Sequence, residues 1–277
     1  MEFKKVHLLL LACFFAALAG GLYVGAHFIA QKLSIVEDSS SVENVGFFFL
    51  YILFATAMML VLLRYYRGSK LFFLAELLLE FSAMQILLSL FLSDLYSGAI
   101  ALALVFMRVF EKRLKQPLLL IATVIVGALL GSSFDLVPAL ALSFLLAAYD
   151  YYAVFKSKHM VTLAKELQKR EAAFAIEISV PSAQGKAGSP QARGKNPEKP
   201  SSRGESILLG TGDFVIPIML CVSVLKLSVF AALVTALGAF VGLSALLFAM
   251  QKTRGYYPAL PPIVLFSTLF YALTLLL

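Results

Sequence analysis

Two aspartates, Asp150 and Asp213, stand within otherwise apolar runs of the chain. A helix needs ~20 residues to cross a bilayer, and these runs are about that long. A carboxylate at membrane depth costs at least ~2.5 kcal/mol, so such a residue is a candidate for function. Two carboxylates held together away from water do not both ionise easily, and a pair that shares one proton can activate a water molecule.

The positions of these two aspartates predict that they meet. Asp150 lies six residues before Lys156, and Asp213 lies seven residues after Ser206, where its apolar run begins. In helices, these separations place both carboxylates ~9–10 Å from the same end of two antiparallel spans. The alternative is two independent acids that reach for the interface, but aspartate is too short to do this well.

The residues just before Asp213 are poor helix formers. Gly210 and Gly212, which flank Thr211, weaken a helix, and Pro217 removes a donor from the hydrogen-bond ladder. Broken backbone at membrane depth is tolerated where it lines a cavity or is buried in protein. We therefore expect a strand-like approach to Asp213 that helps to shape a site.

A second irregular segment falls at the same depth. Pro258-Ala259-Leu260-Pro261-Pro262 has three prolines in five residues, which a helix interior cannot hold. Non-helical backbone here would lie against the two aspartates and shape a cleft. The simpler alternative is the start of a helix, because proline is accepted in a first turn.

Two further acids, Glu76 and Glu80, lie in an earlier apolar run. They are four residues apart and therefore share one face of a helix. We interpret them as structural, paired with Arg67 or Lys70 or reaching for the interface, rather than catalytic. A proton relay is the remaining alternative.

Other hydrolytic chemistries find no support in the sequence. It contains no HExxH zinc motif, and Cys13 and Cys221 show no metal-binding spacing. His7, His27 and His159 do not accompany a serine in a triad pattern. We expect neither a metal nor another cofactor.

The elements that carry these residues are membrane spans. Of the 277 residues, 61% are hydrophobic and only 14% are charged, whereas soluble domains are about 45–50% apolar. The sequence predicts an all-α polytopic protein with nine transmembrane helices, at residues 6–30, 46–63, 71–92, 96–110, 117–132, 137–155, 206–225, 228–250 and 260–277. The first run also resembles a signal peptide cut after Ala19, but it continues too far past that point, so we favour a retained helix.

These spans define three parts of the chain. Residues 1–155 hold transmembrane helices 1–6, and residues 206–277 hold helices 7–9. Residues 156–205 between them are polar. Their first part, 162–178, predicts an amphipathic helix on the membrane surface, and residues 181–203 predict a disordered linker.

The basic residues fix the expected orientation. With nine spans, every Lys and Arg except Lys32 and Lys226 falls on one side. Because cytoplasmic loops carry the Lys/Arg excess, we expect a cytoplasmic N-terminus and long loop and an outer C-terminus. The net charge of +7 therefore reflects membrane topology, and we expect no nucleic-acid partner.

Three short motifs contain the residues described above: Tyr149-Asp150, Gly210-Thr211-Gly212-Asp213 and Pro258-Ala259-Leu260. They lie on the sixth, seventh and ninth of the nine spans. In residues, order and position they resemble the YD, GxGD and PAL motifs of the presenilin and signal peptide peptidase family. Thr211 stands where the family often has Leu. The orientation is nearer to presenilin, and the compact size is similar to an archaeal-type homologue in a microbial cell membrane.

This resemblance implies an intramembrane aspartyl endopeptidase with Asp150 and Asp213 as its catalytic pair. Tyr149, Gly210, Thr211, Gly212 and the Pro258–Leu260 segment would shape the site or bind substrate. The implied partners are transmembrane-helix substrates and the lipid bilayer, and self-association into a homo-oligomer stays open. Two alternatives also stay open: a proton- or cation-coupled channel or transporter that uses the same aspartates, and a prepilin-type peptidase.

Overall fold

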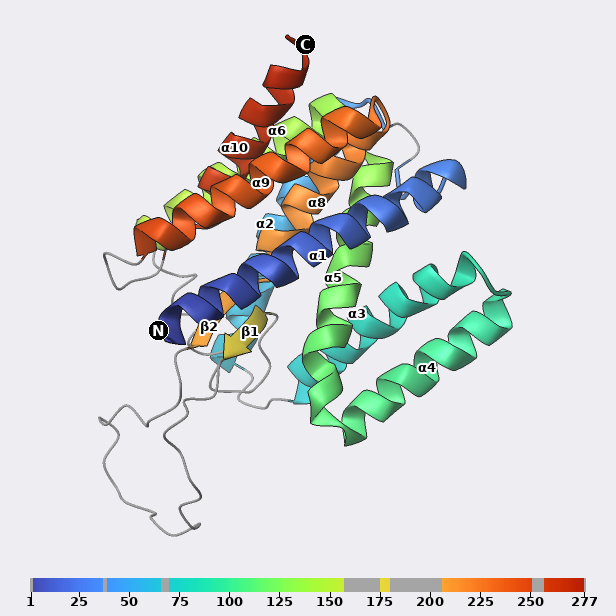
Figure 1. Ribbon diagram of the computed structural model, residues 1–277. Coiled ribbons are helices and arrows are strands. Elements are labelled where there is room, and N and C mark those ends of the chain that lie inside the picture. Colours follow the sequence, from blue (N-terminus) through green and yellow to red (C-terminus); the bar gives the residue numbers. More distant parts are fainter. Residues whose placement is uncertain are drawn as a thin grey trace, which may run out of the picture.

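The computed structural model describes residues 2–36, 39–65, 70–156, 175–179, 206–250 and 257–276. Within these ranges the chain forms nine α-helices, one short 3-10 helix and two strands (Figure 1). The elements are α1 (Glu2–Ala30), α2 (Val42–Tyr65), α3 (Lys70–Ser89), α4 (Asp94–Phe110), η1 (Lys112–Leu114), α5 (Lys115–Ser133), α6 (Leu136–Phe155), β1 (Ala175–Ser179), β2 (Ser206–Gly210), α8 (Gly212–Leu225), α9 (Val229–Met250) and α10 (Leu260–Thr274).

The chain is an integral membrane protein. Among the described residues, five helices are long and apolar enough to cross a membrane: the apolar part of α1, together with α3, α5, α6 and α9. Shorter apolar segments lie in α2, α8 and α10. Each of the nine predicted spans overlaps one of these helices or α4.

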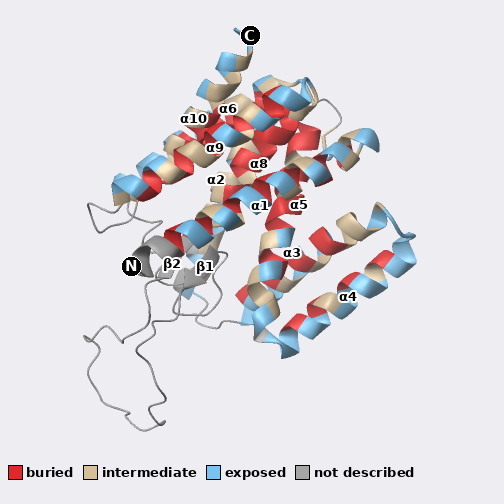
Figure 2. Cartoon of the chain, viewed as in Figure 1, coloured by how far each residue is buried: buried red, intermediate tan, exposed pale blue. Residues whose placement is uncertain are grey.

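α8 lies at the centre of the bundle. It packs against α1, α5, α6, α9 and α10, and ten of its residues are buried. Figure 2 shows this burial along the helix. Because a helix that is apolar on all faces needs neighbours on all faces, α8 is the element around which the others are arranged.

Close backbone contact joins α8 to α1. A methyl group at Gly21 would lie 2.5 Å from Cγ2 of Ile218, and one at Gly25 would lie 2.6 Å from both Cγ atoms of Val222. The two glycines are spaced by four residues, as are the two branched side chains that they receive. Since only glycine leaves this room, the α1–α8 distance depends on it.

α5 packs closely against the same two side chains of α8. A methyl group at Gly127 would lie 2.9 Å from Cβ of Ile218, and one at Gly131 would lie 2.6 Å from Cβ of Val222. It would also lie 2.7 Å from the carbonyl oxygen of Met219. We call these four glycines, on α1 and α5, the glycine clasp. It fixes α8 against two neighbours at the same level.

A buried ion cluster holds the α3–α4 hairpin to α5. Arg108 of α4 contacts Glu76 at 3.0 Å and Glu80 at 3.1 Å, and all three side chains are almost fully buried. Lys115 of α5 lies 3.5 Å from Glu76, and the Arg108 guanidinium lies 5.5 Å from the centre of the Phe73 ring. Arg108 and the two glutamates are thus paired away from solvent, with the partly exposed Lys115 at the edge of the cluster, and this pairing makes their burial tolerable.

Lys70 is not the partner of the two glutamates. Glu76 and Glu80 contact cations of α4 and α5 instead, so these cations come from the next helices in space and not from a residue nearby in sequence. Arg67, the other partner that the sequence suggested, lies outside the described residues.

Two expectations about the region around the long loop are wrong. The predicted amphipathic helix, 162–178, does not extend through its last part, because β1 covers Ala175–Ser179; residues 162–174 and the predicted linker lie outside the described part of the chain. The seventh span is not helical from Ser206, because β2 occupies its first five residues and α8 begins at Gly212. In both places an antiparallel strand pair takes the place of the expected helix.

We predict that Gly131→Ala destabilises the protein and Gly46→Ala does not. The methyl at position 131 meets the α8 backbone, which cannot move aside cheaply, and overpacking of this kind costs ~1–3 kcal/mol. Gly46 is also helical, but a methyl there meets nothing within 4 Å. The melting temperature in detergent should fall by a few degrees only for Gly131→Ala. Equal melting temperatures for the two variants would show that the clasp is loose.

Candidate functional site

The structure brings Asp150 and Asp213 together. Asp150 lies in the second half of α6 and Asp213 in the first turn of α8, and these helices pack against each other. Both side chains are partly buried. The Asp150 carboxylate is near enough to Asp213 for an electrostatic interaction between them. The expected meeting of the two aspartates therefore agrees with this geometry.

Asp213 is held by the last residue of β2, just before its own helix. The amide of Gly210 donates to Oδ2 of Asp213 at 3.2 Å. Asp213 also lies among the unpaired amides of the first turn of α8, where the helix dipole favours a negative charge. The carboxylate thus has polar support although the rest of α8 is apolar.

Asp150 is held by the start of a different helix. The amide of Leu260 donates to Oδ2 of Asp150 at 3.3 Å. Leu260 is the first residue of α10, and Pro261 and Pro262 follow it. Because proline has no N–H, Leu260 carries the only amide donor among these three residues. The start of α10 therefore presents the amide of Leu260 to the aspartate, and the amide of the preceding Ala259 interacts with it as well.

The sequence of the Pro258–Leu260 segment suggested either irregular backbone beside the aspartates or the start of a helix, and the structure shows both. Pro258 and Ala259 precede the helix, and α10 begins at Leu260. All three residues are buried. The segment is thus both a helix start and an irregular piece of backbone in contact with Asp150.

Tyr149, the residue before Asp150 in α6, contacts α2. Its ring lies 6.3 Å from that of Phe49 in α2, at 86° between the ring planes, and its hydroxyl interacts with the side chain of Thr56. Adjacent residues on a helix point in different directions. Tyr149 therefore joins α6 to α2 beside the site.

Thr211 and Gly212 link β2 to α8. The carbonyl of Thr211 accepts hydrogen bonds from the amides of Phe214 and Val215, at 3.1 and 3.0 Å, which starts the helix. Gly212 is exposed, and a methyl there would meet nothing within 4 Å. By contrast, a methyl at Gly210 would lie 3.2 Å from Oδ2 of Asp213.

The antiparallel pair of β1 and β2 leads directly into this site. Its register pairs Ala175 with Gly210 and Ser179 with Ser206, and β1 also contacts α1 and α5. Sequence reasoning missed β1 as a strand. The signal was present in Ala-Ile-Glu-Ile-Ser, residues 175–179, whose alternation of apolar and polar residues is typical of a strand.

The polar groups of the site are two carboxylates and the backbone amides that donate to them. In the part of the chain that the structure describes, no three His, Cys, Asp or Glu side chains cluster as metal ligands would. Two neighbouring carboxylates with backbone donors are suited to general acid–base chemistry on a water molecule.

Comparison with known proteins identifies the class to which this fold and site belong. The model of the signal-peptide peptidase and presenilin aspartyl protease family matches residues 11–268. A solved presenilin family intramembrane aspartate protease, in space group C222, is similar over 100% of both chains, with 21% identity and a TM-score of 0.67. A second such structure, in space group P2, is similar over 95% of this chain and 96% of that one, with 23% identity and a TM-score of 0.64.

No curated protein sequence matches the chain significantly. The solved structures share its fold, and the family model covers nearly its whole length. The chain belongs to the signal-peptide peptidase and presenilin family of aspartyl proteases, and it is an intramembrane-cleaving aspartic endopeptidase. This assignment favours the protease interpretation over a transporter or a prepilin-type peptidase.

We predict different kinetic effects for alanine at the two glycines before Asp213. Gly210→Ala places a methyl against the Asp213 carboxylate, and a displacement of a reacting group can cost up to ~100-fold in rate, so kcat should fall ~10–100-fold. Gly212→Ala places its methyl in open space, so kcat should stay near that of the wild type and any change should appear in KM. Cleavage of a single-span substrate at several concentrations separates the two parameters. A larger loss of kcat at Gly212 than at Gly210 would contradict the geometry.

Proposed function

We propose that Asp150 and Asp213 are the catalytic pair and that they jointly activate a water molecule to cleave transmembrane segments. One observation carries this proposal. The described helices α6 and α8 carry one aspartate each, and these two aspartates lie together at membrane depth, where each accepts a hydrogen bond from the backbone. A purely structural acid in a membrane would instead be neutralised by a cation, as Glu76 and Glu80 are by Arg108.

The proposed reaction divides two roles between the carboxylates. One is ionised and takes a proton from the attacking water, while the other is protonated and donates a hydrogen bond to the scissile carbonyl. The water oxygen then bonds to the carbonyl carbon, and the leaving amine takes a proton as the C–N bond breaks. Because the pair shares its proton, neither role belongs permanently to one residue.

The distribution of charge supports an orientation for the site. All the basic residues except Lys32 and Lys226 lie on the predicted cytoplasmic side. With a cytoplasmic N-terminus and an outer C-terminus, the two aspartates lie toward the cytoplasmic face. The resemblance to archaeal-type homologues suggests the cell membrane of a microbe as the location.

A helical substrate must be unwound before its peptide bonds are accessible, since its backbone groups are paired within the helix. β2 offers a template for the extended form. One edge of β2 pairs with β1, and no other strand among the described residues pairs with its second edge. We propose that the substrate adds to this edge by β-augmentation, with Gly210–Gly212 and the Pro258–Leu260 segment beside the scissile bond.

We predict that Asp150→Asn and Asp213→Asn each abolish cleavage while the protein stays folded. Loss of an acid–base group costs at least ~100-fold, and amide side chains keep the size of the carboxylates. The assay is fragment formation from a single-span substrate in proteoliposomes. The matched control is Asp94→Asn, because Asp94 is an exposed acid at the start of α4. Fragments that persist in both site variants would refute the catalytic assignment.

We predict that backbone methylation of the substrate blocks cleavage at alternate positions only. In a strand, successive amides point to opposite edges, so N-methyl groups at one alternate set of residues disrupt pairing with β2 and those at the other set do not. Loss of two hydrogen bonds should reduce kcat/KM ~10–100-fold. Two substrates with the same number of N-methyl groups, shifted by one residue, serve as mutual controls. Equal cleavage of both would exclude strand addition.

A further inference from the structure

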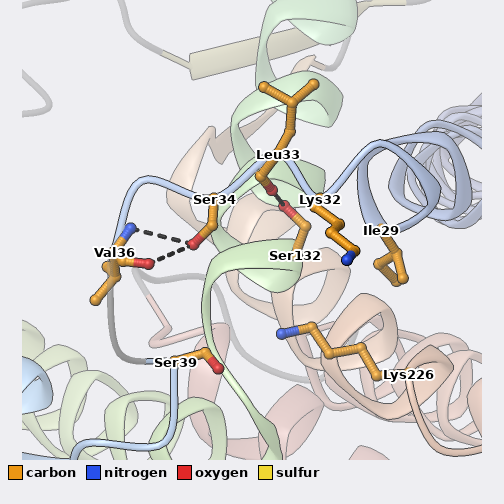
Figure 3. A pocket seen from close by; sticks show the side chains of 8 residues that line it. All are labelled: Ile29, Lys32, Leu33, Ser34, Val36, Ser39, Ser132 and Lys226. Atoms are coloured by element: carbon orange, nitrogen blue, oxygen red, sulfur yellow. Dashed lines mark hydrogen bonds between the residues drawn. The ribbon is translucent and has the colours of Figure 1, made fainter.

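The two basic residues that depart from the charge asymmetry line one cavity. Lys32 follows α1, and Lys226 follows α8, and both border a cavity of about 220 Å³. Figure 3 shows the two ammonium groups directed toward the same space. These lysines are 194 residues apart in the sequence, so the fold itself brings them together.

Hydrogen bonds between distant segments fix the walls of this cavity. The hydroxyl of Ser132 in α5 donates to the carbonyl of Leu33 at 2.9 Å, and the amide of Ile35 donates to Ser133 Oγ at 2.8 Å. The amide of Asp135 donates to the carbonyl of Ser39 at 2.9 Å. The segments that follow α1 and precede α2 are thus tied to the end of α5, and the cavity is bounded by connected structure.

The two lysines differ in how their charges are compensated. Lys226 donates to Asp135 Oδ1 at 3.0 Å and to the carbonyl of Phe134 at 3.0 Å. An ammonium has three donors, so one remains for the cavity. Among the described residues, Lys32 has no acidic partner and is exposed. Lys32, Lys226 and Asp135 together therefore leave a net charge of +1 at the cavity.

The cavity lies where lipid headgroups would be. It is formed at the end of α8 opposite Asp213, thirteen residues along the chain, or ~20 Å away. The hydrocarbon core of a bilayer is ~30 Å thick, so this end of the bundle reaches the opposite interface. Ile29 and Leu33 add apolar wall to the cavity, which suits a ligand with both a charge and a hydrocarbon part.

We propose that this cavity binds the phosphate headgroup of an anionic phospholipid. A singly charged phosphodiester would offset the net charge of +1 and accept hydrogen bonds from Lys32 and from the remaining Lys226 donor. Its acyl chains would lie along the lipid-facing surface of the bundle. Capping of helix ends explains Lys226, whose ammonium contacts a carbonyl, but it does not explain Lys32, whose ammonium contacts no carbonyl among the described residues.

The test compares three soluble ligands on the purified full chain in uncharged detergent. They are short-chain phosphatidylglycerol, short-chain phosphatidylcholine and inorganic phosphate, each titrated while the melting temperature and bound ligand, by native mass spectrometry, are measured. A ligand that binds the folded state raises the melting temperature. We expect phosphatidylglycerol to bind more tightly than either other ligand. Inorganic phosphate that binds as well as phosphatidylglycerol would overturn the assignment to lipid.

Variants then locate the site. Lys32→Gln removes one charged donor and should weaken phosphatidylglycerol binding ~10-fold. Lys156→Gln is the matched control, because Lys156 is an exposed lysine after α6, away from the cavity. Equal affinity in Lys32→Gln and the wild type would overturn the proposal.

The acidic neighbours Glu37 and Asp38, which lie outside the described residues, need their own variant. Their double change to Gln and Asn should leave phosphatidylglycerol affinity within about twofold of the wild type. If lipid binds only after this change, the protein's own acids neutralise the lysines and the proposal fails.

Discussion

The position of α8 depends on the glycine clasp. Ile218 and Val222 fit against glycines of α1 on one face and against glycines of α5 on another, so α8 can neither rotate nor slide without collision. Within a membrane, where lipid is as apolar as leucine, such close packing is a main source of helix association. Asp213 lies five residues before Ile218 on this helix. The depth of the aspartate therefore follows from the packing of glycines that make no contact with it.

The surroundings of Asp150 are also fixed by close packing at a glycine, here between α9 and α10. α10 crosses α9 where a methyl at Gly242 would lie 2.7 Å from the carbonyl of Pro262, and α10 also packs against α6. This contact holds the start of α10, and with it the amide of Leu260, which donates a hydrogen bond to Asp150. Asp150 is thus held by the start of α10, and Asp213 lies in the first turn of α8 and accepts from the end of β2. Close helix packing positions both helix starts. The site can be rigid even though the segments between its helices are irregular.

Sequence predicted the helices well because hydrophobic length is the main determinant of a membrane span. It also predicted that Asp150, Asp213 and the Pro258 segment would lie together, because the charged ends of the spans fix depth. It predicted a strand-like approach to Asp213, but not that β2 would begin at Ser206 or pair with β1, since that pairing joins segments that are distant in the sequence. It missed Arg108 as the partner of Glu76 and Glu80 because hydropathy assigns depth but not which helices adjoin.

The contrast between the two pairs of acids explains how polar groups are divided in this membrane protein. Glu76 and Glu80 are neutralised by full charges from Arg108 and Lys115, and a carboxylate so neutralised is a poor base. Asp150 and Asp213 are supported instead by backbone amides, which stabilise an ionised carboxylate without supplying a cation. Because amides at helix starts carry only partial charge, the pair keeps the capacity to exchange a proton. Backbone amides beside the aspartates, rather than basic side chains, are therefore the form of support that acid–base chemistry at this depth requires.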